Sequence, residues 1–299
     1  MNYLNVKETA VRWGISERSV RNYCAAGRVT GAVWQAGVWQ IPENAEKPVR
    51  LNQRCEKRTL LSVLREEKKQ HYAGGIYHKT QIELTYNSNH IEGSRLTHDQ
   101  TRYIFETNTI GIEGGVVNVD DVIETANHFR AIDYIIERAN DRLTETFIKA
   151  LHAILKTGTS DSRKDWFAVG DYKKLPNEVG GLETAAPEDV HARIKALLAA
   201  YNKKKDKTLA DLLDFHVSFE RIHPFQDGNG RVGRLILFKE CLRCGIVPFI
   251  IEDDLKWYYY RGLTEWDGEK GYLTDTCLTA QDRYRAYLKY FRIQEAQHE

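Results

Sequence analysis

Residues 223–234, which read HPFQDGNGRVGR, constrain this chain more than any other stretch. Apolar residues recur at helical spacing on both sides of it, so the sequence predicts two buried helices joined by a glycine-containing turn. The apolar positions are Leu212, Leu213, Phe215, Val217, Phe219 and Ile222 before the turn, and Val232, Leu235, Ile236, Phe238 and Leu242 after it. His223 is therefore expected at the end of the first helix, and Gly245 is expected to end the second.

The residues of this turn are those that phosphate chemistry needs. Free amide groups and the positive dipole end at a helix start favour an anion, and Gly228 and Gly230 let the backbone approach phosphate oxygens. Asp227 lies where a carboxylate beside phosphates needs a divalent cation, which suggests Mg²⁺. Arg231 and Arg234 are three residues apart on one helical face, so both guanidinium groups are expected to reach a polyphosphate. Each feature alone is also typical of an ordinary helix end, turn or solvated arginine, but together they predict a nucleotide site.

The same stretch resembles, at every fixed position, the signature HPFx(D/E)GNGRxxR of the Fic family (filamentation induced by cyclic AMP). The resemblance implies a mainly α fold with a helical core and a small β-hairpin flap. It also implies transfer of AMP from ATP to a hydroxyl group of a target protein, with His223 as general base. The other residues that it assigns are Asp227 for Mg²⁺, Gly228, Asn229 and Gly230 for the phosphate cradle, Arg231 for the phosphates of the leaving group, and Arg234 for the γ-phosphate.

A second pattern, SNHIEG at residues 88–93, ends a helix predicted over about residues 79–92. Ser88 and Glu92 are four residues apart and share a face of this helix. By composition alone, Glu92 is typical of a solvated residue near a helix end. The pattern resembles the inhibitory motif (S/T)xxxE(G/N) of the Fic class whose inhibitory helix is N-terminal in the same chain. That resemblance implies an ion pair between Glu92 and Arg234 that blocks the γ-phosphate.

The alternatives differ in the reaction and in the class of protein. A Fic site can instead remove AMP from a modified protein, in which case Glu92 would orient a water molecule. Some members of the family transfer other phosphorus-containing groups, although the second glycine and both arginines favour ordinary ATP orientation. The chain can also be chiefly a DNA-binding regulator with a weak Fic site.

Residues 169–181 are rich in glycine and charge and predict a small hairpin. In the family, a flap at this place positions the target backbone by strand addition, and Lys174, Leu175 and Pro176 are the candidates for that contact. The family often has Gly-x-Tyr-Arg just before the flap, whereas residues 170–173 read GDYK here.

Residues 1–48 are predicted to form a domain of their own. Two short helices separated by Gly14-Ile15, followed by two alternating strands about Ala36-Gly37, are typical of a winged helix-turn-helix. This region resembles the domains of MerR and excisionase-like proteins, with contacts to DNA predicted for Arg18, Arg21 and Arg28. The alternative is that the module docks on the catalytic domain or on a partner. A linker and a helix are predicted over residues 49–75, and the Fic domain over residues 76–299.

Composition adds a few limits. The 299 residues carry a net charge of +1, so any contact with nucleic acid has to be local. No apolar run approaches membrane-spanning length and no signal-peptide core is present, which predicts a cytoplasmic protein without a membrane contact. Five scattered cysteines argue against a disulfide framework. His128 and His152 are typical of packed histidines rather than metal ligands.

The predicted partners of the chain are ATP, a target protein, DNA and a second copy of the chain.

Overall fold

The computed structural model describes residues 2–35, 37–48, 59–112, 115–179 and 182–295. The chain divides into two compact units, Met1–Glu56 and Lys57–Glu299. The predicted linker over residues 49–58 lies outside the described residues, so the boundary expected after residue 48 stays a prediction.

The first unit contains two helices and a small sheet. In chain order its elements are β1 (Tyr3–Leu4), α1 (Val6–Trp13), α2 (Glu17–Ala25), β2 (Val33–Gln35) and β3 (Val38–Pro42). Asn5 caps α1 in a capping box with Glu8, Gly14 ends α1 in the left-handed conformation, and Ser16 caps α2. The strands are antiparallel in the order β1-β3-β2. The short strand β1 was not predicted, because two residues are too few to show an alternating pattern.

The first unit has its own apolar core. Its buried members are Ala10, Trp13, Val20, Cys24, Val29 and Ile41. They come from α1, α2, β3 and the segment after α2, so one side of each helix faces the sheet.

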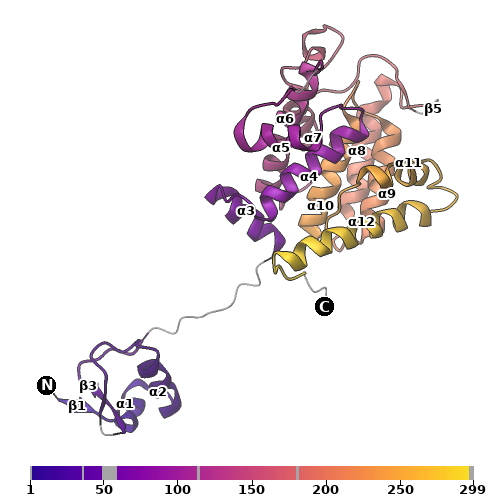
Figure 1. The fold of residues 1–299 in the computed structure, drawn as a ribbon. Helices are drawn as coiled ribbons and strands as arrows, with labels where there is room; N and C mark the ends of the chain where they lie inside the picture. The colour runs from indigo at the N-terminus through magenta and orange to yellow at the C-terminus, as the bar shows by residue number, and fades with distance from the viewer. Residues whose placement is uncertain (1, 36, 49–58, 113–114, 180–181, 296–299) are drawn as a thin grey trace. The chain divides into compact units, whose positions relative to one another are not determined.

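The second unit is mainly helical (Figure 1). Its helices are α3 (Leu60–Gln70), α4 (Ile76–Ile91), α5 (His98–Thr107), α6 (Val119–Glu137), α7 (Glu145–Lys156), α8 (Pro187–Lys203), α9 (Leu209–Ile222), α10 (Asn229–Cys244), α11 (Lys256–Thr264) and α12 (Gly271–Tyr290). Two short 3₁₀ helices, η1 (Asp161–Arg163) and η2 (Asp253–Leu255), and a two-stranded hairpin of β4 (Glu178–Val179) and β5 (Leu182–Glu183) complete it. No described helix has both the length and the apolarity to cross a bilayer.

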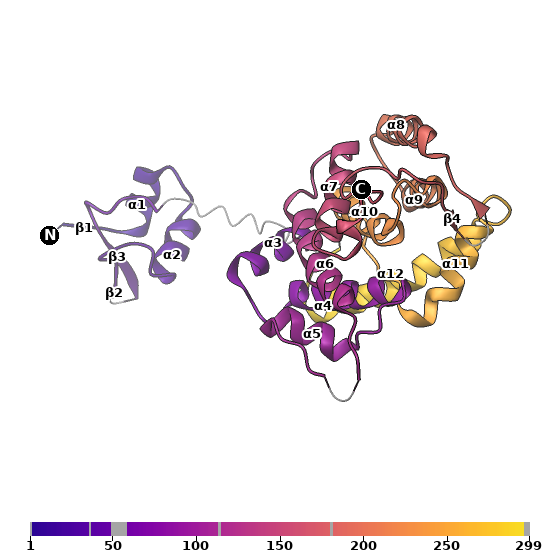
Figure 2. The same cartoon turned by 90° about the horizontal axis from the view of Figure 1, so that it is seen from above.

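Helix α10 lies at the centre of this unit, in contact with α4, α6, α7 and α9 (Figure 2). A helix that is covered on all sides has to bury its charged residues as well as its apolar ones. Arg231, Arg234, Lys239 and Glu240 of α10 are all buried. Each of these charges therefore needs a partner. Lys239 and Glu240 pair with each other at 2.6 Å, whereas Arg231 and Arg234 pair with Glu124 and Glu92 from other elements, and these two arginines lie at the candidate site.

Helix α4 carries several buried polar side chains on the face that meets α6 and α10. Thr85 Oγ1 lies 2.9 Å from His128 Nδ1, and Asn89 Nδ2 donates to Thr125 Oγ1 at 3.1 Å. Burial lowers the pKa of His128 to about 3, so its ring is neutral and Nδ1 can accept from the Thr85 hydroxyl. These bonds hold the last two turns of α4 against α6.

Some predicted boundaries differ from the structure. Helix α4 begins at Ile76 rather than near residue 79, because Gly75 is its N-cap and Glu67 Oε2 accepts from the Tyr77 amide at 2.8 Å. The hairpin comprises β4 and β5, which lie later in the chain than the centre of the predicted range, 169–181. The earlier residues instead bond to the segment after α9, and Pro176 has no amide hydrogen for a strand ladder.

Candidate active site

His223 is the C-cap of α9, where its backbone adopts a left-handed conformation with φ of 51°. Its Nδ1 donates to the carbonyl oxygen of Glu220 at 3.3 Å, so Nε2 carries the free lone pair of the neutral ring. Burial lowers the pKa of His223, and the positive charge of Lys173 acts in the same direction. A neutral, oriented imidazole at the end of a rigid helix is what a general base requires.

The loop after His223 is closed by the side chain of Asn229. Its Oδ1 accepts from the amide of Phe225 at 2.8 Å, and its Nδ2 donates to the carbonyl oxygen of Phe225 at 2.8 Å. Gly228 then takes a left-handed conformation with φ of 82° as the N-cap of α10, and no side chain caps this helix start. The first amides of α10 are thus free to bind an anion.

Arg234 is 6% exposed and faces the end of α4. Its Nε donates to Ser88 Oγ at 3.0 Å, and Nη2 donates to the carbonyl oxygen of Ser88 at 2.9 Å. The same Nη2 lies 2.7 Å from Glu92 Oε1. Glu92 also lies against Gly230, where an added Cβ would overlap its carboxylate. The carboxylate of Glu92 therefore lies against both the guanidinium group and the first turn of α10.

Glu220 lies behind this pair and is a second carboxylate near Arg234. Burial raises the pKa of Glu220 to about 8, with Arg234 opposing that rise and Glu92 adding to it. Glu220 is therefore mostly protonated at neutral pH. Glu92 is the carboxylate that balances the charge of Arg234.

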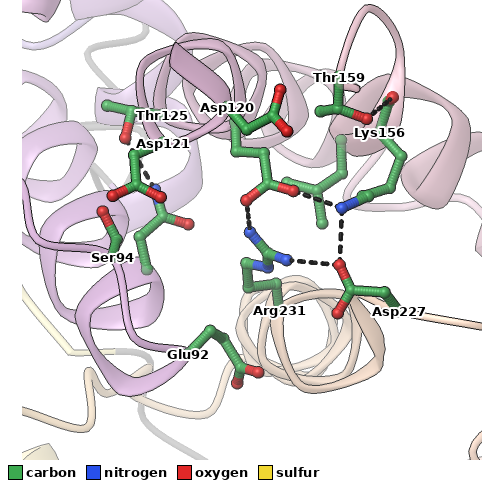
Figure 3. Close-up of polar contacts among 12 residues, drawn as sticks. Glu92, Ser94, Asp120, Asp121, Thr125, Lys156, Thr159, Asp227 and Arg231 are labelled. Atoms are coloured by element: carbon green, nitrogen blue, oxygen red, sulfur yellow. Dashed lines mark hydrogen bonds and ion pairs between the residues drawn. The ribbon is translucent and has the colours of Figure 1, made fainter. Parts of the chain in front are cut away.

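A second ionic cluster lies at Asp227. Lys156 Nζ is 2.6 Å from Asp227 Oδ2, 2.5 Å from Glu124 Oε1 and 3.4 Å from Asp161 Oδ2. Arg231 pairs with the other oxygen of Glu124 and lies 3.3 Å from Asp227 Oδ2. Figure 3 shows Lys156 and Arg231 both pointing at Asp227. Burial alone would raise the pKa of Asp227, but Arg231 and Lys156 outweigh it and lower this pKa to about 2.

His152 connects the loop to the segment that precedes the hairpin. Its Nδ1 accepts from the amide of Gly170 at 2.9 Å, which leaves Nε2 to donate to the carbonyl oxygen of Asp227 at 3.2 Å. Its ring stacks on Phe225 with 4.0 Å between centroids. Burial lowers the pKa of His152 to about 4, so this arrangement holds at neutral pH. His152 is packed, as expected, and it also fixes the loop.

The donor set at Asp227 fits Mg²⁺ bound together with phosphates. Among the described residues, no group of three or more His, Cys, Asp or Glu side chains is placed to hold a metal ion. Mg²⁺ is commonly bound by one or two carboxylates with substrate phosphates and water, rather than by an all-protein cage. The side chain of Asp227 is 47% exposed beside the free amides of α10, and only its Oδ2 is taken by Lys156 and Arg231. Asp227 is therefore the residue that can hold such an ion.

The predicted flap residues lie between the motif loop and β4. The amide of Leu175 donates to Gln226 Oε1 at 3.2 Å, and Lys174 Nζ donates to the carbonyl oxygen of Asp165 at 3.1 Å. The segment thus runs beside the loop that carries His223.

Several residues of the site were not among the predicted ones. They are Glu124, His152, Lys156, Asp161 and Glu220. The sequence holds one weak indication that Lys156 is buried, because it follows His152 by four residues and so continues the buried face of α7. Glu124 lies 107 residues from Arg231 in the sequence, and nothing in the chain pattern links the two.

Comparisons with known proteins identify similar sequences. Residues 142–240 match the model described as the Fic/DOC family. The chain is 28% identical over 225 residues to "Protein adenylyltransferase Fic" of Drosophila mojavensis, covering 72% of this chain and 42% of that protein. Over 205 residues it is also 28% identical to the protein of the same name from Drosophila melanogaster, covering 67% and 38%. The chain spans about two fifths of the length of these relatives.

Solved structures give the same fold. A Fic-domain-containing signalling protein from Bacteroides thetaiotaomicron matches with a TM-score of 0.57 and 29% identity, covering 77% of this chain and 90% of that one. Fic-1 (residues 134–508) from C. elegans matches with a TM-score of 0.60 and 18% identity, covering 80% and 73%, and is similar in fold alone. These findings support a Fic-family domain within this chain.

Lys156→Met is expected to lower the free energy of unfolding by about 3 kcal/mol at neutral pH, because it leaves Glu124, Asp161 and Asp227 with less compensating charge. This cost is at the low end for a broken buried ion pair because the side chain of Asp227 is 47% exposed. Urea denaturation measures this change. Lys164→Met, which removes an exposed partner of the same Asp161 at 2.6 Å, is the control and should cost less than about 1 kcal/mol. Equal stability of the two variants would contradict this account of the cluster.

Proposed function

We propose that the second unit transfers AMP from ATP to a hydroxyl side chain of a target protein and releases pyrophosphate. The observation that carries this proposal is the arrangement of His223, Asp227 and the free amides of α10 around one loop. The names of the Drosophila relatives, which are protein adenylyltransferases, support the same reaction.

In the proposed reaction, the target hydroxyl oxygen attacks the α-phosphorus of ATP and the bond to the bridging oxygen of pyrophosphate breaks. His223 Nε2 takes the proton of the hydroxyl as the new P–O bond forms. Gly228, Asn229 and Gly230 present backbone amides to the phosphates, so negative charge is stabilised without reorganisation of the site. Arg231, which pairs with Glu124 and Asp227 in the protein alone, is proposed to meet the phosphates of the leaving group.

Asp227 is proposed to hold Mg²⁺ when ATP is present. Such an ion would neutralise phosphate charge during transfer. In the protein alone, Lys156 and Arg231 keep the carboxylate ionised and fix one of its oxygens.

We further propose that this is a repressed form of the enzyme. Arg234 is assigned to the γ-phosphate, but Ser88 and Glu92 already occupy its Nε and Nη2. ATP must therefore displace Glu92 or bind with its phosphates misplaced.

Lys174, Leu175 and Pro176 are proposed to contact the target protein. The support for this proposal is that Leu175 is 46% exposed and that its amide donates to Gln226 Oε1, three residues after His223. A target segment along this side would present its hydroxyl to the imidazole.

The first unit is proposed to bind DNA. Its two capped helices and the hairpin of β2 and β3 have the order of a winged helix-turn-helix. Arg18 and Arg21 are exposed on α2, although Arg21 also pairs with Glu17 at 2.8 Å, and Arg28 lies over the ring of Tyr23 at 5.0 Å. A cytoplasmic location is proposed with this function.

Transfer is tested by incubation with Mg²⁺ and ATP labelled at the α-phosphate, with γ-labelled ATP in parallel. Label on protein is expected from α-labelled ATP alone. Glu92→Gly should raise labelling at least about tenfold, because the charge-assisted bond to Arg234 is lost. His223→Ala should lower it by a factor of about 100 or more in both backgrounds, as removal of a general base does.

Label from γ-labelled ATP, or full labelling in the His223→Ala protein, would contradict AMP transfer. Loss of AMP from a modified protein that requires Glu92 would instead establish the removal reaction.

DNA binding is tested by the fluorescence anisotropy of a labelled random-sequence duplex at increasing salt. Arg18→Ala is expected to weaken binding and to reduce the slope of log K against log salt by about 1, because one phosphate contact is lost. Arg193→Ala, on an exposed face of α8, is the control. An unchanged anisotropy with the wild-type chain would contradict the proposal.

A further inference from the structure

Lys173 is a buried lysine with neutral partners. Its residue is 3% exposed, and Nζ donates to Asn177 Oδ1 and to Thr184 Oγ1, each at 2.6 Å. Among the side chains that the structure describes, a set that does not include that of Glu183, no carboxylate pairs with this ammonium group. Burial lowers the pKa of Lys173 to about 8, which reflects the cost of keeping the charge there. A charged group retained in a buried place despite this cost indicates that its hydrogen bonds hold particular residues in position.

The two acceptors lie on opposite sides of the hairpin. Asn177 immediately precedes β4 and Thr184 immediately follows β5. Thr184 Oγ1 is also 2.8 Å from the carbonyl oxygen of Asn177. The ammonium group of Lys173 thus joins both ends of the hairpin at its base.

The same residues are tied to the loop that carries His223. The amide of Lys173 donates to the carbonyl oxygen of Pro224 at 2.9 Å, and Asn177 Nδ2 donates to the carbonyl oxygen of Phe225 at 3.0 Å. The amide of Ala185, just after Thr184, donates to the carbonyl oxygen of Ile222 at 3.3 Å. The base of the hairpin is therefore held against the residues on both sides of His223.

We propose that Lys173 is a positioning residue that clamps the base of the hairpin to the His223 loop, so that a target segment in contact with Lys174, Leu175 and Pro176 is held with its hydroxyl at the imidazole. The inference rests on the proposed AMP transfer for its consequence, but the clamp itself is a property of this chain. Lys173 does not touch ATP in this account. Its loss should affect transfer to protein and leave nucleotide binding unchanged.

Hydrogen exchange of the 299-residue chain tests the clamp without an activity measurement. In Lys173→Met, the amides of Leu175 and Ala185 are expected to exchange at least about tenfold faster, because charge-assisted bonds that close the hairpin base are lost. Lys173→Arg, which keeps the charge and the donors, should restore most of the protection. Lys195→Met, the same change at an exposed position of α8, is the control and should exchange as the wild type does.

Thr184→Ala tests the clamp with a smaller change, in case Lys173→Met does not fold. It removes one acceptor and should accelerate exchange at Ala185 severalfold. Unchanged exchange at Leu175 and Ala185 in a folded Lys173→Met protein, or in Thr184→Ala, would overturn the proposal.

The effect of Lys173 on AMP transfer is measured in proteins that also carry Glu92→Gly, with saturating α-labelled ATP and Mg²⁺. Lys173→Met should lower protein labelling at least about tenfold, Lys173→Arg should recover most of it, and the Kd for ATP should stay within about twofold. Equal loss of ATP affinity and labelling would overturn a positioning role in favour of general destabilisation. If Glu92→Gly itself gives no label, the proposed function fails, and the exchange measurement still decides the clamp.

Discussion

The buried guanidinium group of Arg234 is the group on which the proposed repression depends. It projects from the central helix α10 and has to be satisfied by whatever lies beside it, because a buried charge without a partner is very costly. Ser88 and Glu92 satisfy it from α4, 146 and 142 residues away in the sequence. Helix α4 is itself held to α6 through Thr85 and Asn89. The position of the end of α4 therefore decides which groups face Arg234.

The other charged residues of the site also have to find partners of opposite charge. Lys156, Arg231 and the more exposed Lys164 pair with the carboxylates of Glu124, Asp161 and Asp227. Three cations therefore face three carboxylates. A divalent cation at Asp227 would be needed only when phosphates add further negative charge. His152 and Asn229 contribute neutral hydrogen bonds that fix the loop backbone. Charged groups therefore set the electrostatic environment of Asp227, and neutral hydrogen bonds fix the conformation of the loop backbone.

The sequence predicted the parts of the fold that have a local cause. Helices α9 and α10 follow from apolar periodicity, and their ends at His223 and Gly245 lie where the chain pattern placed them. The pairing of Glu92 with Arg234 followed from a family resemblance, since no local rule joins residues so far apart. The cluster around Lys156 was missed because its partners come from α6, η1 and the motif loop. The hairpin was placed too early, because tertiary bonds to Pro224 and Gln226 compete with strand pairing.

The most direct test of this account is the Kd for ATP in the presence of Mg²⁺, measured by calorimetry for the wild-type chain, Glu92→Gly and Glu83→Gln. Glu83 lies on the same helix and pairs with Lys79 at 2.6 Å, away from Arg234, so its variant serves as the control. If Glu92 occupies the γ-phosphate site, Glu92→Gly should bind ATP at least about tenfold more tightly, and Glu83→Gln should match the wild type. Equal affinities of the wild type and Glu92→Gly would contradict the central claim that Arg234 is withheld from ATP.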